Sequence, residues 1–102
     1  MKNMLDYIHQ NYSQPITIQD VSASANISKS ECFRCFSELS KITPVEYINK
    51  FRLLQASQLL LTTDKSMVDI CYTTGFNNTS YFSKKFKEQY GVTPKAYRSK
   101  HH

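Results

Sequence analysis

Glycine and proline are scarce in this chain, whose 102 residues include two glycines and three prolines. Tight hairpin turns depend on such residues, so their scarcity argues against a fold of many short strands and favours helices. No apolar run approaches the roughly 20 residues that a membrane-spanning helix needs. Because 40% of the residues are hydrophobic, we expect the chain to fold around a modest core as an all-α protein.

Cysteine is also rare, and the three that occur form an odd number. An odd count argues against the disulfide framework of a small secreted protein. The opening residues, MKNMLDYIHQ, lack the apolar stretch of a signal peptide. We therefore expect a cytoplasmic protein.

Acidic residues are few in the second half of the chain. Residues 1–51 contain five basic and five acidic residues, whereas residues 52–102 contain eight basic and three acidic ones, which accounts for the whole net charge of +5. A localised positive charge indicates an anionic partner. Nucleic acid is the leading candidate, and an acidic membrane surface or an ordinary solvated surface are the alternatives.

An internal repeat organises the sequence. SELSKITPVEY at residues 37–47 resembles KEQYGVTPKAY at residues 87–97, with four identical residues at an offset of 50. Upstream the offset becomes 49, which pairs Asn26 with Gly75. Each copy covers about 30 residues, so the chain contains a duplicated unit rather than a solenoid, which needs three or more copies.

Each copy carries the signals of two helices joined by a short turn. Sequences that resemble capping boxes begin at Thr17, Ser28 and Ser66. Asn26 and Gly75 suit the left-handed conformation that ends the first helix of each pair. We expect second helices at about residues 29–40 and 78–90, the latter capped by Asn77. Two helices joined in this way form a helix-turn-helix unit.

Residues 44–62, between the copies, have the pattern of a longer helix with Pro44 at its first position. Apolar residues recur through it at helical spacing: Ile48, Phe51, Leu54 or Gln55, Ala56, Leu59 and Leu60. A helix of this length measures about 27 Å. We therefore expect about seven helices in three segments, with the first helix-turn-helix unit at residues 1–43, the linker helix at 44–62 and the second unit at 63–102.

These motifs resemble those of the AraC/XylS-type DNA-binding domain. The similarity is carried by GFNNTSYFSKKF at residues 75–86 and GVTPKAYR at 91–98, and by DYIHQNYSQPITIQDV and EYINKFRLLQA upstream. The resemblance implies a bacterial transcription regulator that binds double-stranded DNA with two recognition helices in successive major grooves. It also implies RNA polymerase as a second partner, no membrane partner, no cofactor and no enzymatic activity. An effector or dimerisation domain, if the regulator has one, lies outside this chain.

The first predicted recognition helix has two unlike sides. Cys32, Cys35, Phe36 and Leu39 share an apolar face, and the opposite side carries the candidate DNA-binding residues Lys29, Ser30, Phe33 and Arg34. Arg34 can donate two hydrogen bonds to one guanine, or it is a solvated or phosphate-bound arginine. Phe33 packs against a thymine methyl group or folds back onto the protein.

In the second recognition helix the candidate DNA-binding residues are Asn78, Thr79, Ser80, Tyr81, Ser83 and Lys84. Their hydroxyl and amide groups suit base edges and phosphates equally well. Tyr81 contacts a phosphate through its hydroxyl or simply packs. We expect phosphate contacts or general attraction from Lys85, Lys87, Lys95 and Arg98. For Arg52, an ion pair within the protein and a DNA contact both stay open.

Two other classes of function compete with DNA binding. Cys32 and Cys35 form a Cys-x-x-Cys pair, which would suit a thiol redox or metal module. Zinc needs further ligands, and the sequence has no second Cys-x-x-Cys and no His-x3-His pair. We therefore expect no metal and no catalytic residues. The other alternative is a helical protein-interaction module.

Overall fold

The computed structural model describes residues 1–101, within which the chain forms seven helices. They are α1 (Lys2–Asn11), α2 (Ile18–Ser24), α3 (Lys29–Ser40), α4 (Pro44–Thr62), α5 (Met67–Thr73), α6 (Thr79–Tyr90) and α7 (Pro94–His101). The predicted all-α fold is confirmed. His102, the last residue of the predicted second unit, lies outside the described residues. Within residues 1–101, no helix combines the length and the apolar character that crossing a membrane requires.

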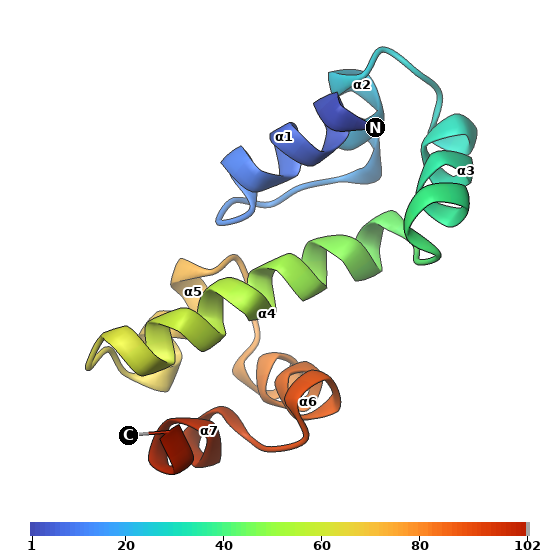
Figure 1. Ribbon diagram of the computed structural model, residues 1–102. Helices are drawn as coiled ribbons and strands as arrows, with labels where there is room; N and C mark the ends of the chain where they lie inside the picture. Colours follow the sequence, from blue (N-terminus) through green and yellow to red (C-terminus); the bar gives the residue numbers. More distant parts are fainter. Residues whose placement is uncertain (102) are drawn as a thin grey trace.

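The long helix α4 connects two groups of three helices. Figure 1 shows α3 beside the start of α4, α1 and α2 above it, α6 below its middle, and α5 and α7 towards its end. The molecule measures 43 × 22 × 21 Å along its principal axes. It is therefore elongated, with both helix-turn-helix pairs packed against α4.

Two separate hydrophobic cores hold the two groups of helices together. The first contains Met4, Ile8, Val21, Cys32, Phe36 and Ile48. The second contains Leu53, Ala56, Leu60, Ile70, Cys71, Phe76, Phe82 and Phe86. Full burial of one large apolar side chain contributes about 1.5–3 kcal/mol. Because α4 contributes to both cores, it is part of each unit as well as the connection between them.

The apolar face predicted for α4 is partly wrong. Leu54 is 44% exposed, whereas its neighbour Leu53 is only 3% exposed and belongs to the second core. The reason is that α4 serves two cores that lie on different sides of it. Its buried residues therefore do not follow a single stripe, and a search for one face assigns some positions to the wrong side.

The predicted caps are confirmed at three helices and wrong at one. Thr17 and Ser28 form reciprocal capping boxes, and the hydroxyl of Ser66 accepts a hydrogen bond from the third amide of α5. Asn77, however, does not cap α6. Asn78 does so, with its Oδ1 accepting from the backbone N–H of Tyr81 at 2.9 Å. Ser28 lies 50 residues before Asn78, so the offset of 50 already applies at the cap and the extra residue of the second copy precedes it.

The turns between the paired helices have matching geometry. Asn26 has φ of 57° and Gly75 has φ of 98°, as the predicted left-handed turn requires. The next residues, Ile27 and Phe76, each donate their N–H to the carbonyl five residues earlier, at 3.1 and 3.0 Å. The same left-handed turn therefore precedes the second helix of each unit, α3 in the first and α6 in the second.

Candidate nucleic-acid interface

The first two turns of α3 pack against the first core. Cys32 and Phe36 are fully buried, and Cys35 packs against the same core while partly exposed. Leu39, which the sequence pattern assigns to this face, is 67% exposed. That assignment is wrong because the last turn of α3 projects past the side chains that form the core.

The outer side of α3 carries the four residues predicted for the first unit. Lys29, Ser30, Phe33 and Arg34 are all exposed. Phe33 is 44% exposed and lies outside the first core, so its ring is available to a partner. The carboxylate of Glu31, on the same helix, accepts hydrogen bonds from the amide and hydroxyl of Ser28. It therefore acts as part of the cap.

The second core holds α6 through Phe82 and Phe86, both buried. Of the residues predicted for this helix, Asn78, Thr79, Ser80, Tyr81 and Lys84 are exposed, while Ser83 is partly buried. Asn78 is committed through its Oδ1 to the helix cap. The outer surface of α6 is thus small, polar and basic, whereas that of α3 carries an arginine and an aromatic ring.

Tyr81 connects α6 to the linker helix α4. Its hydroxyl accepts a hydrogen bond from Nδ2 of Asn49 on α4 at 3.1 Å, and Nζ of Lys85 lies 5.6 Å from its ring centroid. A phenol that accepts one hydrogen bond keeps its own O–H for donation. Packing against Asn49 and donation to a phosphate are therefore compatible at this residue.

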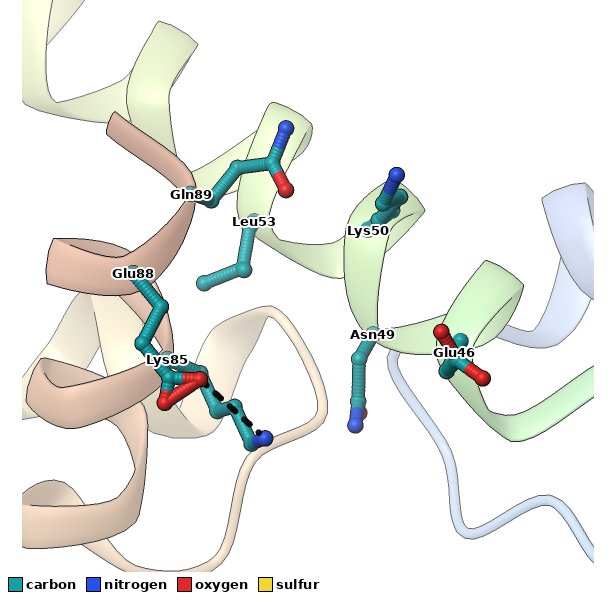
Figure 2. Close-up of a pocket in the computed structure, with 7 residues that line it drawn as sticks. All are labelled: Glu46, Asn49, Lys50, Leu53, Lys85, Glu88 and Gln89. Carbon is teal, nitrogen blue, oxygen red and sulfur yellow. Dashed lines mark hydrogen bonds and ion pairs between the residues drawn. The ribbon is translucent and has the colours of Figure 1, made fainter. Parts of the chain in front are cut away.

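A shallow groove of about 170 Å³ separates the first half of α4 from α6. Figure 2 shows Glu46, Asn49, Lys50 and Leu53 on one side of it and Lys85, Glu88 and Gln89 on the other. Lys85 pairs with Glu88 across 3.4 Å. Of the two lysines of α6 predicted to attract phosphate, Lys85 therefore has a carboxylate neighbour and Lys87 lies exposed, as does the candidate DNA-binding residue Lys84.

Two arginines are engaged within the protein. Arg98 of α7 donates to the backbone carbonyls of Leu60, Thr63 and Lys65 at 3.0, 3.0 and 2.7 Å. Its guanidinium therefore closes the end of α4, and its predicted contact with or attraction to phosphate stays a prediction. Arg52 also binds carbonyls rather than a carboxylate, so the ion pair considered for it is not formed.

The cysteines are packing residues in this structure. Cys32 and Cys71 are buried, and burial raises the pKa of both thiols; the nearby Cys35 adds to the effect at Cys32. A raised pKa lowers the fraction of reactive thiolate. All three thiols are free, and no group of three or more potential metal ligands is gathered anywhere in residues 1–101.

The sequence singled out Arg52 and Gly75 for other roles, and it gave no sign of Asn49 or of the contact between the two units. Asn49 and Arg52, on α4, bind partners 32 to 40 residues away, and Gly75, in the turn before α6, lies close to Tyr12, 63 residues earlier. Contacts of this kind leave no local pattern. The one available signal was Gly75, which stands where the first unit has Asn26.

Comparison with known proteins identifies similar chains. A family model described as a helix-turn-helix domain matches residues 21–100. The uncharacterized HTH-type transcriptional regulator YdeC of Bacillus subtilis is 36% identical over 98 residues, which cover 96% of this chain and 34% of that protein. An AraC-type transcriptional regulator from Chromobacterium violaceum matches with a TM-score of 0.92 at 26% identity, over 98% of this chain and 89% of that one.

A solved complex with DNA is among the similar structures. The DNA-binding domain of the global transcriptional factor AdpA, bound to a target DNA, has a TM-score of 0.92 at 25% identity, over 97% of this chain and 89% of that one. The chain spans about a third of the length of the regulators that it matches by sequence. The similarity therefore concerns one part of those proteins.

Proposed function

The chain belongs to the AraC-type family of helix-turn-helix DNA-binding domains of transcription regulators, and from that premise we propose how it binds DNA. In this proposal it recognises a specific double-stranded sequence by placing α3 and α6 in successive major grooves. The family is one of DNA-binding proteins rather than enzymes.

The observation that carries the proposal is the repeated presentation of a recognition helix. Each unit ends its first helix in a left-handed turn and exposes the polar side of its second helix. Major grooves on one face of DNA recur about every 34 Å, and the molecule is 43 Å long. Because α4 is a single helix, the two units are held apart rigidly, and bending of the DNA would then contribute to the binding energy.

On α3, we assign base reading to Arg34 and Phe33. Arg34 is exposed and can donate two hydrogen bonds to guanine O6 and N7, whereas Phe33 offers an apolar surface to a thymine methyl group. Lys29, near the N-terminus of the helix, contacts phosphate, and Ser30 contacts phosphate or base edges there.

On α6, we assign base or phosphate contacts to Lys84, Thr79 and Ser80, which are exposed. Tyr81 donates its hydroxyl to a phosphate while it accepts from Asn49. Two further residues of the predicted set, Asn78 and Ser83, contribute less, because Asn78 caps the helix and Ser83 is partly buried. Non-specific attraction comes mainly from the basic second half of the chain.

The wider setting is part of the same proposal. A regulator that binds promoter DNA works in the cytoplasm of a bacterium and has RNA polymerase as its neighbour there. The recognition units comprise residues 1–43 and 63–102, with residues 44–62 between them. Support for these points comes from the family and from the similarity to transcription regulators.

An unbiased selection of bound duplexes from a random pool tests the proposal. We expect the enriched sequences to share a motif with two constrained blocks, centred about 10–10.5 base pairs apart. The motif should be asymmetric, because the exposed residues of α3 and α6 differ. Enriched sequences without a common motif would contradict sequence-specific binding, and a motif with one block would contradict the use of both helices.

A further inference from the structure

Arg52, the ninth residue of the 19-residue helix α4, holds the first unit against the linker. Its Nε–H donates to the carbonyl oxygen of Tyr12 at 2.8 Å, and its Nη2–H donates to that of Gln14 at 2.9 Å. Both carbonyls belong to the segment that joins α1 to α2. The guanidinium is partly withdrawn from water, and this desolvation lowers the pKa of Arg52.

Gly75 of the second unit lies beside the hydrogen bond between Arg52 and the Tyr12 carbonyl. A Cβ atom added to Gly75, in the turn that precedes α6, would collide with the Tyr12 carbonyl oxygen and would lie 2.6 Å from Nε of Arg52. Gly75 also has φ of 98°. Glycine is therefore needed here for two reasons, the left-handed backbone and the close approach of the first unit. Asn26, at the equivalent place in the first unit, has only the first requirement.

A second contact lies one helical turn away on α4. Asn49 binds the Tyr81 hydroxyl of α6, and together with Arg52 it borders a crevice of about 290 Å³ whose walls come from both units, including Ile16 and Phe76. The two cores themselves share no residue. Beside Arg52, the Tyr12 carbonyl of the first unit and Gly75 of the second unit lie close together.

We propose that Arg52 is a positioning residue that fixes the separation and relative rotation of α3 and α6, and thereby sets the spacing between half-sites that the protein accepts. The inference rests on the proposed function and adds a residue that touches no DNA in this scheme. Linker rigidity alone fixes the axis of α4. Arg52 binds Tyr12 and Gln14 of the first unit and lies beside Gly75 of the second. These contacts fix the orientation of the first unit relative to the turn that precedes α6.

Arg98 provides a matched control for this junction. Its guanidinium also binds backbone carbonyls, but those carbonyls belong to Leu60, Thr63 and Lys65, at the end of α4 and just after it. Arg98→Ala therefore removes a similar number of hydrogen bonds without touching the contact between the two units. A general loss of stability should appear in both variants, and a change in geometry only in Arg52→Ala.

The test uses duplexes that carry the selected site with the spacing between its blocks changed by one or two base pairs. For the wild type and Arg98→Ala, we expect affinity to fall at least tenfold when the spacing changes by one base pair. For Arg52→Ala, we expect the ratio of the affinity at the original spacing to the affinity at the changed spacing to be threefold or less. The reason is that the substitution weakens binding mainly to the duplex with the original spacing. Arg52→Lys, which keeps the charge but cannot donate to both carbonyls in the same way, should lie between them. An Arg52→Ala ratio equal to that of the wild type would overturn the proposal.

A measurement without DNA separates this inference from the proposed function. Spin labels carried by unnatural amino acids at the exposed positions Ser37 on α3 and Lys87 on α6 report the distance between the helices. We expect a broader distance distribution in Arg52→Ala than in the wild type and Arg98→Ala. Equal widths in all three would refute the positioning role. Absence of any selected DNA motif would refute the function and leave this measurement to decide the role of Arg52.

Discussion

Asn49 of α4 donates a hydrogen bond from Nδ2 to the hydroxyl oxygen of Tyr81 on α6, at 3.1 Å. This contact allows the packing role of Tyr81 to be separated from a DNA contact. Tyr81→Phe removes the hydroxyl altogether, whereas Asn49→Ala removes only the donor and leaves the phenol in place. A hydrogen bond to a charged group contributes about 1.5 kcal/mol, or roughly tenfold in affinity.

From that difference we expect Tyr81→Phe to weaken DNA binding about tenfold. Asn49→Ala should keep affinity close to that of the wild type, with stability lowered slightly in both variants. Dissociation constants measured on the selected site give the comparison. Equal losses of affinity in the two variants would show that the hydroxyl serves the protein and not a phosphate.

Arg34 should read a base, because it is exposed on the outer side of α3 and can form a bidentate contact with guanine. Arg34→Ala is expected to cost about 1–3 kcal/mol of binding free energy and to relax the preference at one base pair. Lys29→Ala, on the same helix, serves as the control and should weaken all sequences alike. Affinities for all four bases at each position of the site measure the preference. A uniform loss for Arg34→Ala would assign it to phosphate.

The salt dependence of binding should reflect the uneven distribution of charge. Lys84→Gln combined with Lys87→Gln removes two exposed charges of α6, whereas Lys29→Gln combined with Lys41→Gln removes two exposed charges from the first unit. Each lost phosphate contact lowers the slope of log K against log salt by about 0.9. We expect the larger decrease for the α6 pair, measured between low and moderate salt. An equal decrease for both pairs would contradict the prediction.

The paired cysteines should matter for stability and not for binding. Cys32 is buried in the first core and Cys35 packs against it, so Cys32→Ala combined with Cys35→Val is expected to lower the free energy of unfolding by about 1–2 kcal/mol. Binding to the selected site should be kept at temperatures where the variant is folded. Chemical denaturation and binding assays on the same sample provide both quantities. Lost binding at unchanged stability would revive a chemical role for the thiols.

Local features were the part of the fold that the sequence could predict. The hydroxyl of Ser28 and the turn at Asn26 act within four residues of their own positions, so the helix starts and turns that depend on them are visible in the sequence. The duplication then reinforced each signal. Even so, the sequence predicts the cap of α6 one residue early, at Asn77, because the pattern alone does not locate the change of offset between the copies.

Long-range contacts were the part that could not be predicted. Arg52 and Arg98 look alike in the sequence, as basic residues on helices, yet their guanidinium groups bind carbonyls 33 to 40 residues away. Leu39 fits the apolar spacing of α3 but extends beyond the core that the other residues fill. The partners of these arginines and the exposure of Leu39 depend on where neighbouring helices end. The spacing of apolar residues in the sequence does not give that information. Whether the ten candidate residues contact DNA stays a prediction.

The most direct test of the central claim is the affinity of this chain for its selected site relative to a shuffled duplex of the same composition. Specific DNA-binding proteins favour their sites by about 10³-fold or more at physiological salt. We predict a ratio of at least that order near 150 mM salt, falling by about a factor of ten or more for Arg34→Ala, which removes the base contact proposed for α3. A ratio near one would contradict the account.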